Sequence, residues 1–252
     1  MTSQTHRYKL IISYDGTNYS GWQVQPNSIS IQELIEKALF TLFHYPIKVL
    51  SSSRTDAGVH ALGQVAHISL NEKADEEKLL FSLNGILPRD IRINSLHATE
   101  PDFHARFDAT RKVYHYHLHC EKFHDPSTRF YSYHVRPTLD IEALKKAIPH
   151  FIGTHNFKAF ANKNEKGSAK TSPIKTIYTI NLVEQRGGYR LEFEGDGFLY
   201  KMVRNIVGTL LDCSYGKIDP DTIPDVLHSL ERKQTARSAP AHGLFLMRVD
   251  YT

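Results

Sequence analysis

Segments with strand periodicity and segments with helix periodicity interleave along this chain, and their order is the strongest constraint on its fold. In the first half, runs of β-branched, aromatic and aliphatic residues predict strands at 8–14, 48–52, 64–70 and 91–97. Apolar residues at helical spacing predict helices at 31–43, with Ser30 as the N-cap, and at 75–87. The first half is therefore expected to run β-α-β-β-α-β.

The second half repeats this theme, with strands predicted at 111–120, 131–135, 175–185, 189–194 and 244–251 and helices at 140–148, 201–213 and 221–230. Arg186-Gly187-Gly188 predicts a hairpin turn, and 131–135 is expected to be the hairpin partner of 111–120. Because hairpins break a strict β-α alternation, we predict an α+β fold. Its two similar halves, 1–105 and 106–252, would join antiparallel sheets into a shared central sheet, with helices on one side and a basic cleft.

The composition is compatible with a nucleic-acid partner without requiring one. Lys and Arg exceed Asp and Glu by 31 to 27, which gives 252 residues a formal charge of +4. The two cysteines, Cys120 and Cys213, lack C-x-x-C spacing, which excludes a disulfide framework and a cysteine-rich zinc site. The first residues contain no apolar signal core and no apolar run approaches the length of a membrane span, so we expect a cytoplasmic protein with no membrane partner.

The segment Ser53-Arg54-Thr55-Asp56-Ala57-Gly58-Val59-His60 is polar, lies between two predicted strands and contains a carboxylate close to an arginine and a glycine. From residue types alone, an ordinary surface turn is the better interpretation, because Asp and Gly are common turn residues. The longer string 54–61, followed by Gly63-Gln64-Val65, changes this interpretation, because it resembles the signature of the tRNA pseudouridine synthase A family.

The resemblance extends over nearly the whole chain, through motifs in the family's order. They are Tyr14-Asp15-Gly16, Gly21-Trp22-Gln23, Leu83-Asn84, Leu87-Pro88, Phe103-His104-Ala105-Arg106, Arg111-Lys112-Val113-Tyr114-His115-Tyr116, Gly153-Thr154-His155-Asn156-Phe157, the stretch 197–208 and Ala239-Pro240-Ala241-His242-Gly243-Leu244. Two positions depart from the family pattern: Ser53 stands where Gly is usual, and Asn156 where Asp is common.

The resemblance implies the pseudouridine synthase fold and an isomerase that converts uridine to pseudouridine at positions 38, 39 and 40 in the anticodon stem-loop of tRNA. It also implies a homodimer that binds tRNA across both subunits. The reaction detaches uracil from the sugar, turns it and rejoins it through carbon. Because no electrons or groups are gained, we expect no cofactor and no metal.

The resemblance assigns roles to individual residues. Asp56 would be the catalytic carboxylate, as nucleophile or as the base that removes a sugar proton. Tyr114 would stack on the flipped base, and Arg204 would pair with the catalytic aspartate. Leu244 would line the base pocket with Phe198 nearby. The residues expected to contact substrate phosphates are Arg54, Arg106, Arg111 and Lys112. Without the family match, Tyr114 would be read as a core residue of its strand.

Three other functions fit parts of the sequence. His115, His117 and His119 alternate along one predicted strand, a spacing that a three-histidine zinc site could use, although solvent-facing alternation explains it equally well. A glycosidase would need a second cooperating carboxylate, and Asp56 has no evident partner in the sequence. A non-catalytic RNA-binding module would have no need for Asp56, Tyr114 and Arg204 together.

Overall fold

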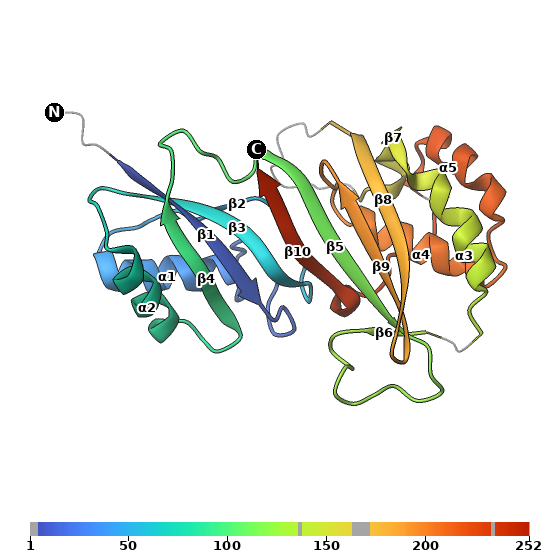
Figure 1. The fold of residues 1–252 in the computed structure, drawn as a ribbon, viewed down its shortest axis with the longest axis horizontal. Helices are drawn as coiled ribbons and strands as arrows, with labels where there is room; N and C mark the ends of the chain where they lie inside the picture. The colour runs from blue at the N-terminus through green and yellow to red at the C-terminus, as the bar shows by residue number, and fades with distance from the viewer. Residues whose placement is uncertain (1–4, 136–137, 163–171, 233–234, 252) are drawn as a thin grey trace. The chain divides into compact units, whose positions relative to one another are not determined.

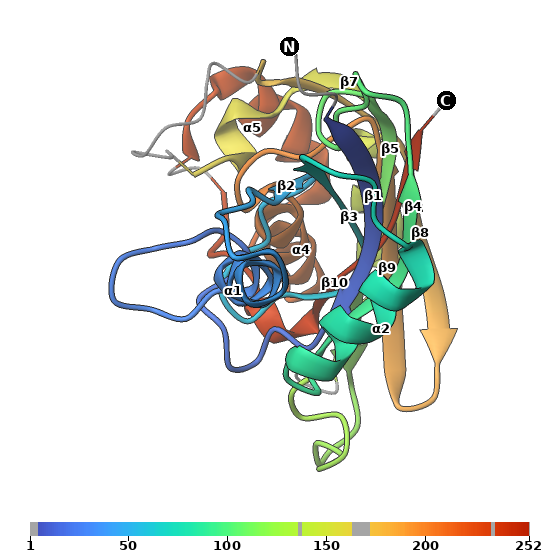
Figure 2. The ribbon, with the colours of Figure 1, turned by 90° about the vertical axis from the view of Figure 1, so that its left-hand side faces the viewer.

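The computed structural model describes residues 5–135, 138–162, 172–232 and 235–251. The chain folds into two units. Unit 1 consists of Met1–Thr110 with Phe245–Thr252, and unit 2 consists of Arg111–Leu244. Each unit has a sheet with helices packed against it (Figures 1 and 2).

The sheet of unit 1 has the strand order β4-β1-β3-β10, formed by β1 (His6–Tyr14), β3 (His60–Leu70), β4 (Ile91–Ala98) and β10 (Leu244–Tyr251). β1 runs antiparallel to both β3 and β4, whereas β10 runs parallel to β3 with Phe245 opposite His60. The short strand β2 (Leu50–Ser51) also pairs with β3. Alternate residues of β1, including Leu10 and Ile12, are fully buried, as expected for a strand with one face on the core.

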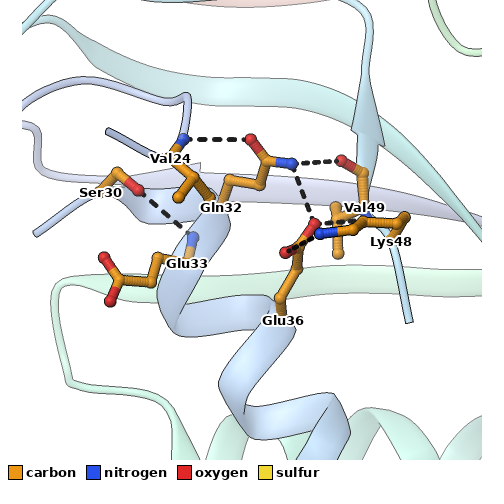
Figure 3. A network of polar contacts seen from close by, with 7 residues as sticks. All are labelled: Val24, Ser30, Gln32, Glu33, Glu36, Lys48 and Val49. Carbon is orange, nitrogen blue, oxygen red and sulfur yellow. Dashed lines mark hydrogen bonds and ion pairs between the residues drawn. The ribbon is translucent and has the colours of Figure 1, made fainter. Parts of the chain in front are cut away.

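Helices α1 (Ile31–Phe43) and α2 (Glu76–Ile86) cover the sheet of unit 1. α1 begins where Ser30 Oγ accepts a hydrogen bond from the backbone N–H of Glu33. The carboxylate of Glu36 ties this helix to the segment before β2, because it accepts a hydrogen bond from Val49 N at 3.1 Å and lies 3.3 Å from Lys48 Nζ (Figure 3).

The sheet of unit 2 has the strand order β5-β9-β8-β7, formed by β5 (Ala109–His119), β9 (Gly188–Gly195), β8 (Ile174–Gln185) and β7 (Gly153–Asn156). Neighbouring strands are antiparallel. Helices α4 (Met202–Ser214) and α5 (Ile223–Ser229) lie on one side of it (Figure 2), and α3 (Ile141–Ala147) packs against α4. Short 3-10 helices span Ile148–Phe151, Phe157–Phe160, Pro220–Thr222 and Ala241–Gly243.

The structure confirms the α+β class, the β-α-β-β-α-β order of the first half, and the hairpin between β8 and β9. The predicted hairpin between 111–120 and 131–135 was wrong. β6 (Tyr133–His134) runs parallel to β5, with Leu118 opposite Tyr133, so it is not a hairpin partner. The loop 120–132 turns the chain back before β6 begins, so that β6 runs in the same direction as β5. The shared central sheet and the basic cleft stay predictions. Within the described ranges, no helix combines the length and apolar character of a membrane span.

Candidate active site

Asp56 lies in unit 1, in the loop between β2 and β3. The loop closes on itself through a hydrogen bond from Val59 N to the carbonyl oxygen of Asp56, at 3.1 Å. Its neighbours Thr55 and Val59 are buried, whereas Asp56 is partly exposed. The loop therefore holds its ends in the core and presents the carboxylate-bearing residue near the surface of the unit.

A second segment, residues 14–22, holds this loop from one side. Trp22 N donates to Thr55 O at 3.0 Å, and Gly58 N donates to Tyr19 O at 3.3 Å. Gly21 has φ +92°, and a Cβ on it would lie 2.6 Å from Thr55 O. Only glycine allows the two backbones to come this close. The glycine in the motif Gly21-Trp22-Gln23 thus acts directly on the position of the Asp56 loop.

Buried polar side chains hold the start of the loop. The hydroxyls of Tyr14 and Thr55 are hydrogen-bonded at 2.7 Å. The amide of Gln64, which is fully buried on β3, donates to Ser53 O at 2.8 Å and accepts from Ser52 Oγ at 2.8 Å. Because such bonds satisfy groups that would be costly to bury alone, they fix the loop in one conformation. Ser53, the departure from the family pattern, is part of this support through its backbone.

Arg54 and Arg106 form a basic pair beside the Asp56 loop. Partial burial of its guanidinium, followed by the positive charge of Arg106, lowers the pKa of Arg54. Arg106 also lies over the exposed ring of Phe107, with its Cζ 5.7 Å from the ring centre. The turn that carries Arg106 is held by a hydrogen bond from Ala105 N to Nδ1 of the buried His67, at 3.1 Å. Two like charges held near each other suit an anion that binds both.

Tyr114 lies on β5 in unit 2 and is 8% exposed. Its ring meets that of Phe198 edge to face, with ring centres 5.3 Å apart and planes at 84°. Across the strands it is paired with Phe193 of β9. Tyr114 and Phe198 therefore lie together in an aromatic cluster that fixes the orientation of the Tyr114 ring, and their roles at the base pocket stay predictions.

Arg204 lies on α4 and contacts the loop 235–240 of unit 2. Its Nε donates to Ala239 O at 2.7 Å, and its own carbonyl oxygen accepts from Ala239 N at 2.9 Å. Its charge also acts on Tyr116 and His242. The guanidinium is thus held by the backbone of this loop, a contact that sequence reasoning did not identify.

A buried polar network fixes the same loop. Asn205, fully buried on α4, donates to Phe160 O at 2.6 Å, and its Oδ1 accepts from Arg232 Nη2 at 2.8 Å and from Ser238 Oγ. Arg232 also donates to Ala236 O at 2.9 Å. In the sequence, the signal that could have revealed this network was an asparagine among the apolar residues of the predicted helix 201–213, because a polar side chain buried there needs hydrogen-bond partners.

Leu244 follows the same loop and is buried. The chain before it is held by Tyr116, whose hydroxyl donates to Pro240 O at 2.8 Å. Burial raises the pKa of Tyr116, while the charge of Arg204 acts in the opposite direction. Tyr114, Phe198, Arg204 and Leu244 are therefore all positioned by elements of unit 2.

Arg111 is oriented differently from Tyr114. The two residues are three positions apart on β5, so their side chains lie on opposite faces of the strand. Arg111 pairs with Glu194 of β9 and lies over the ring of Tyr178 at 5.1 Å. Its role as a phosphate contact stays a prediction, and Lys112 is the basic residue on the face of Tyr114.

Each of the three histidines that were considered for a zinc site has a different polar partner. His115 is 3.8 Å from Glu192, His117 is 3.3 Å from Gln185 Oε1, and His119 Nε2 is 2.9 Å from Phe123 O. Among residues 5–135, 138–162, 172–232 and 235–251, no group of three or more His, Cys, Asp or Glu side chains is arranged to hold a metal ion.

Comparison with known proteins identifies the family. The family model described as tRNA pseudouridine synthase matches residues 10–108 and 147–252. tRNA pseudouridine synthase A 1 of Protochlamydia amoebophila (strain UWE25) is 51% identical, covering 98% of this chain and 96% of its own length. tRNA pseudouridine synthase A of Chlamydia muridarum (strain MoPn / Nigg) is 43% identical, covering 98% of this chain and 92% of its own length. That of Bacillus subtilis (strain 168) is 41% identical, covering 97% of this chain and 99% of its own length. The chain belongs to the tRNA pseudouridine synthase family.

Proposed function

We propose that this protein isomerises uridine to pseudouridine in the anticodon stem-loop of tRNA, at positions 38, 39 and 40, with Asp56 as the catalytic carboxylate. The observation that carries the proposal is the Asp56 loop itself. Backbone hydrogen bonds from Trp22 and to Tyr19, together with the close approach of Gly21, hold a carboxylate in a fixed position. A structural turn needs no such support, whereas a reactive group must be held close to its productive geometry.

The reaction breaks the bond between C1′ and N1 of uridine, turns the uracil and forms a bond between C1′ and C5. The proton lost from C5 balances the proton gained at N1, so the conversion is an isomerisation. Asp56 would serve as the nucleophile at C1′ or as the base that removes a sugar proton. Either role requires a carboxylate next to the sugar and a site that retains the detached base.

The target base must leave the helical stack before Asp56 can reach its sugar, which costs a few kcal/mol. Tyr114 would provide the compensating surface, because Phe198 holds its ring in one orientation. Leu244 would line the same pocket. These roles rest on the family resemblance and on the packing of each residue within unit 2.

Arg204 would pair with Asp56 when the two units act together. Because its Nε donates to Ala239, the pair would use the Nη groups. Arg54 and Arg106 would bind a phosphate of the substrate, since an anion placed near both guanidiniums relieves the repulsion between them. Arg111 would need to leave Glu194 before it could contribute in the same way.

We also propose that residues 1–105 and 106–252 form two functional halves. The protein would be located in the cytoplasm and would act as a homodimer. Two basic surfaces related by a two-fold axis would lengthen the track for a large polyanion beyond what a formal charge of +4 provides. Light scattering at micromolar concentration tests the dimer. A mixture of Asp56→Asn subunits with subunits that carry charge-reversed Arg106 and Arg111 tests whether one tRNA contacts both subunits, because sharing would restore activity that neither parent has.

The function is tested by incubating purified protein with unmodified tRNA and mapping pseudouridine chemically. We expect pseudouridine at positions 38–40 with the parent protein and none with Asp56→Asn, which should still bind tRNA. Asp102→Asn serves as the matched control, because Asp102 is an exposed carboxylate in another loop of unit 1. Activity of Asp56→Asn close to that of the parent would refute the assignment, and modification at other positions would refute the site preference.

A further inference from the structure

The loop 120–132, between β5 and β6 in unit 2, exposes aromatic rings that each have a cation beside them. Phe123 is 75% exposed, and Lys122 Nζ lies 5.3 Å from its ring centre. Phe130 is 42% exposed, and Arg129 Cζ lies 4.2 Å from its ring centre. Figure 1 shows this loop extending beyond the ends of β8 and β9.

Three histidines hold the base of this loop. His119 Nε2 donates to Phe123 O at 2.9 Å, and His134 Nε2 donates to Glu121 O at 2.8 Å. Because a carbonyl oxygen only accepts, both imidazoles carry a hydrogen on Nε2 and can do this while neutral. His124 Nε2 lies 2.9 Å from Ser132 Oγ, and the three rings have centres 4.9 to 5.5 Å apart.

The tip of the loop is also fixed by its own hydrogen bonds. Asp125 Oδ1 accepts from Ser127 N at 2.8 Å and from Ser127 Oγ at 2.7 Å, and these bonds lower the pKa of Asp125. Thr128 N donates to Asp125 O at 3.1 Å, and Tyr131 N donates to Thr128 O at 2.8 Å. The carboxylate of Asp125 is therefore used inside the turn, while Lys122 and Arg129 lie beside the exposed rings.

A loop held this firmly has already lost much of the conformational freedom that a binding partner would otherwise have to remove. Exposed phenylalanine rings offer flat faces on which any nucleobase can stack, and neighbouring lysine and arginine side chains suit the phosphates between bases. A packed core does not explain the ring of Phe123, which is largely exposed, and the ring of Phe130 is partly exposed as well. Double-stranded RNA offers few accessible base faces, so the arrangement fits unpaired nucleotides.

We propose that loop 120–132 binds unpaired nucleotides of the RNA substrate, with Phe123 and Phe130 stacking on bases and Lys122 and Arg129 contacting adjacent phosphates. This inference rests on the proposed function only for the identity of the RNA. It adds a second contact surface, distinct from the Asp56 loop and from the Tyr114 cluster. Its contribution is to substrate affinity, so it should act on KM and leave kcat unchanged.

The test measures the affinity of the Asp56→Asn protein for unmodified tRNA, so that binding is separated from turnover. Replacing both Phe123 and Phe130 by alanine removes two stacking rings and should weaken binding by about thirtyfold or more. Phe81→Ala is the matched control, because Phe81 on α2 is 82% exposed, and it should leave affinity unchanged. Lys122→Ala and Arg129→Ala should each reduce the salt dependence of binding by about one phosphate contact.

The same aromatic substitutions in the active protein should raise KM without lowering kcat. Unchanged tRNA affinity in the doubly substituted protein, with circular dichroism showing a folded chain, would overturn the proposal. The proposal would also be overturned if the double substitution abolished binding of a protein partner and left tRNA binding intact, because the loop would then bind protein and not RNA. Failure of the proposed function is a separate result: the parent protein would then form no pseudouridine in tRNA, whatever the loop binds.

Discussion

His67 provides a quantitative test of how the turn that carries Arg106 is held. The side chain of His67 is 2% exposed, and its Nδ1 accepts the hydrogen bond from Ala105 N at 3.1 Å. Burial, followed by the electrostatic effects of His104 and Arg7, lowers the pKa of His67 from 6.5 to about 4. The folded protein therefore uses the neutral imidazole, whose Nδ1 lone pair is the acceptor for the turn.

The direction and size of the effect follow from proton linkage. Because the folded-state pKa lies below the unfolded value, the unfolded chain binds the His67 proton more readily. The stabilisation is complete above pH 6.5 and is lost as the pH falls from 6.5 toward 4. For these pKa values the free energy of unfolding should decrease by about 2 kcal/mol between pH 7 and pH 5 through His67 alone.

The assay compares urea unfolding of the parent protein and of His67→Asn at pH 7 and pH 5. Asparagine places an oxygen near the Nδ1 position but does not titrate, so the contributions of other groups cancel in the difference between the two proteins. The parent should lose about 2 kcal/mol more than the variant. Equal losses would refute the reasoning, and so would an NMR titration of His67 with a midpoint near 6.5.

The remaining predictions concern the residues of unit 2. Tyr114→Phe keeps the ring that packs on Phe198 and should bind tRNA almost as well as the parent. Tyr114→Ala should lower kcat/KM at least about tenfold, and normal turnover by this variant would exclude a stacking role. Arg204→Lys keeps the charge but loses the Nε donor to Ala239, so its kcat should lie between those of the parent and Arg204→Met; equal rates for lysine and arginine would show that the donor is irrelevant. Asn205→Ala leaves buried partners unsatisfied and should lower the free energy of unfolding by about 2 to 3 kcal/mol, which denaturant titration would measure and which a neutral result would contradict.

Much of the fold could be predicted from local sequence patterns. Helix α1 begins and ends at the predicted residues because Ser30 caps a run with apolar side chains at helical spacing. The β8–β9 hairpin follows from its short glycine-containing turn. The parallel pairing of β6 with β5, and of β10 with β3, was not predictable, because periodicity indicates a strand but not its partner or its direction.

The candidate site shows the same division. The motif around Asp56 predicted the loop, but not that Gly21 and Gln64 hold it, since contacts between distant positions leave no local pattern. Strand alternation alone would have shown that Arg111 and Tyr114 lie on opposite faces of β5. The relative orientation of these two side chains could therefore be predicted from the sequence. The role of Asn205 is intermediate, because a polar residue in an apolar helix indicates burial without naming its partners.

The loop of Asp56 in unit 1 and the loop bound to Arg204 in unit 2 are held in the same way: a glycine lets the loop backbone pack directly against its neighbouring segment. In unit 1, a Cβ on Gly21 would lie 2.6 Å from Thr55 O, next to Asp56. In unit 2, a Cβ on Gly208 of α4 would lie 2.0 Å from Arg237 O, in the loop that accepts the Arg204 hydrogen bond. Contact between two backbones depends on no side-chain rotamer, so it fixes a loop more firmly than a surface hydrogen bond does. The glycines of the two motifs are therefore better explained by the placement of Asp56 and Arg204 than by flexibility, since a loop that moved freely would not require so close an approach.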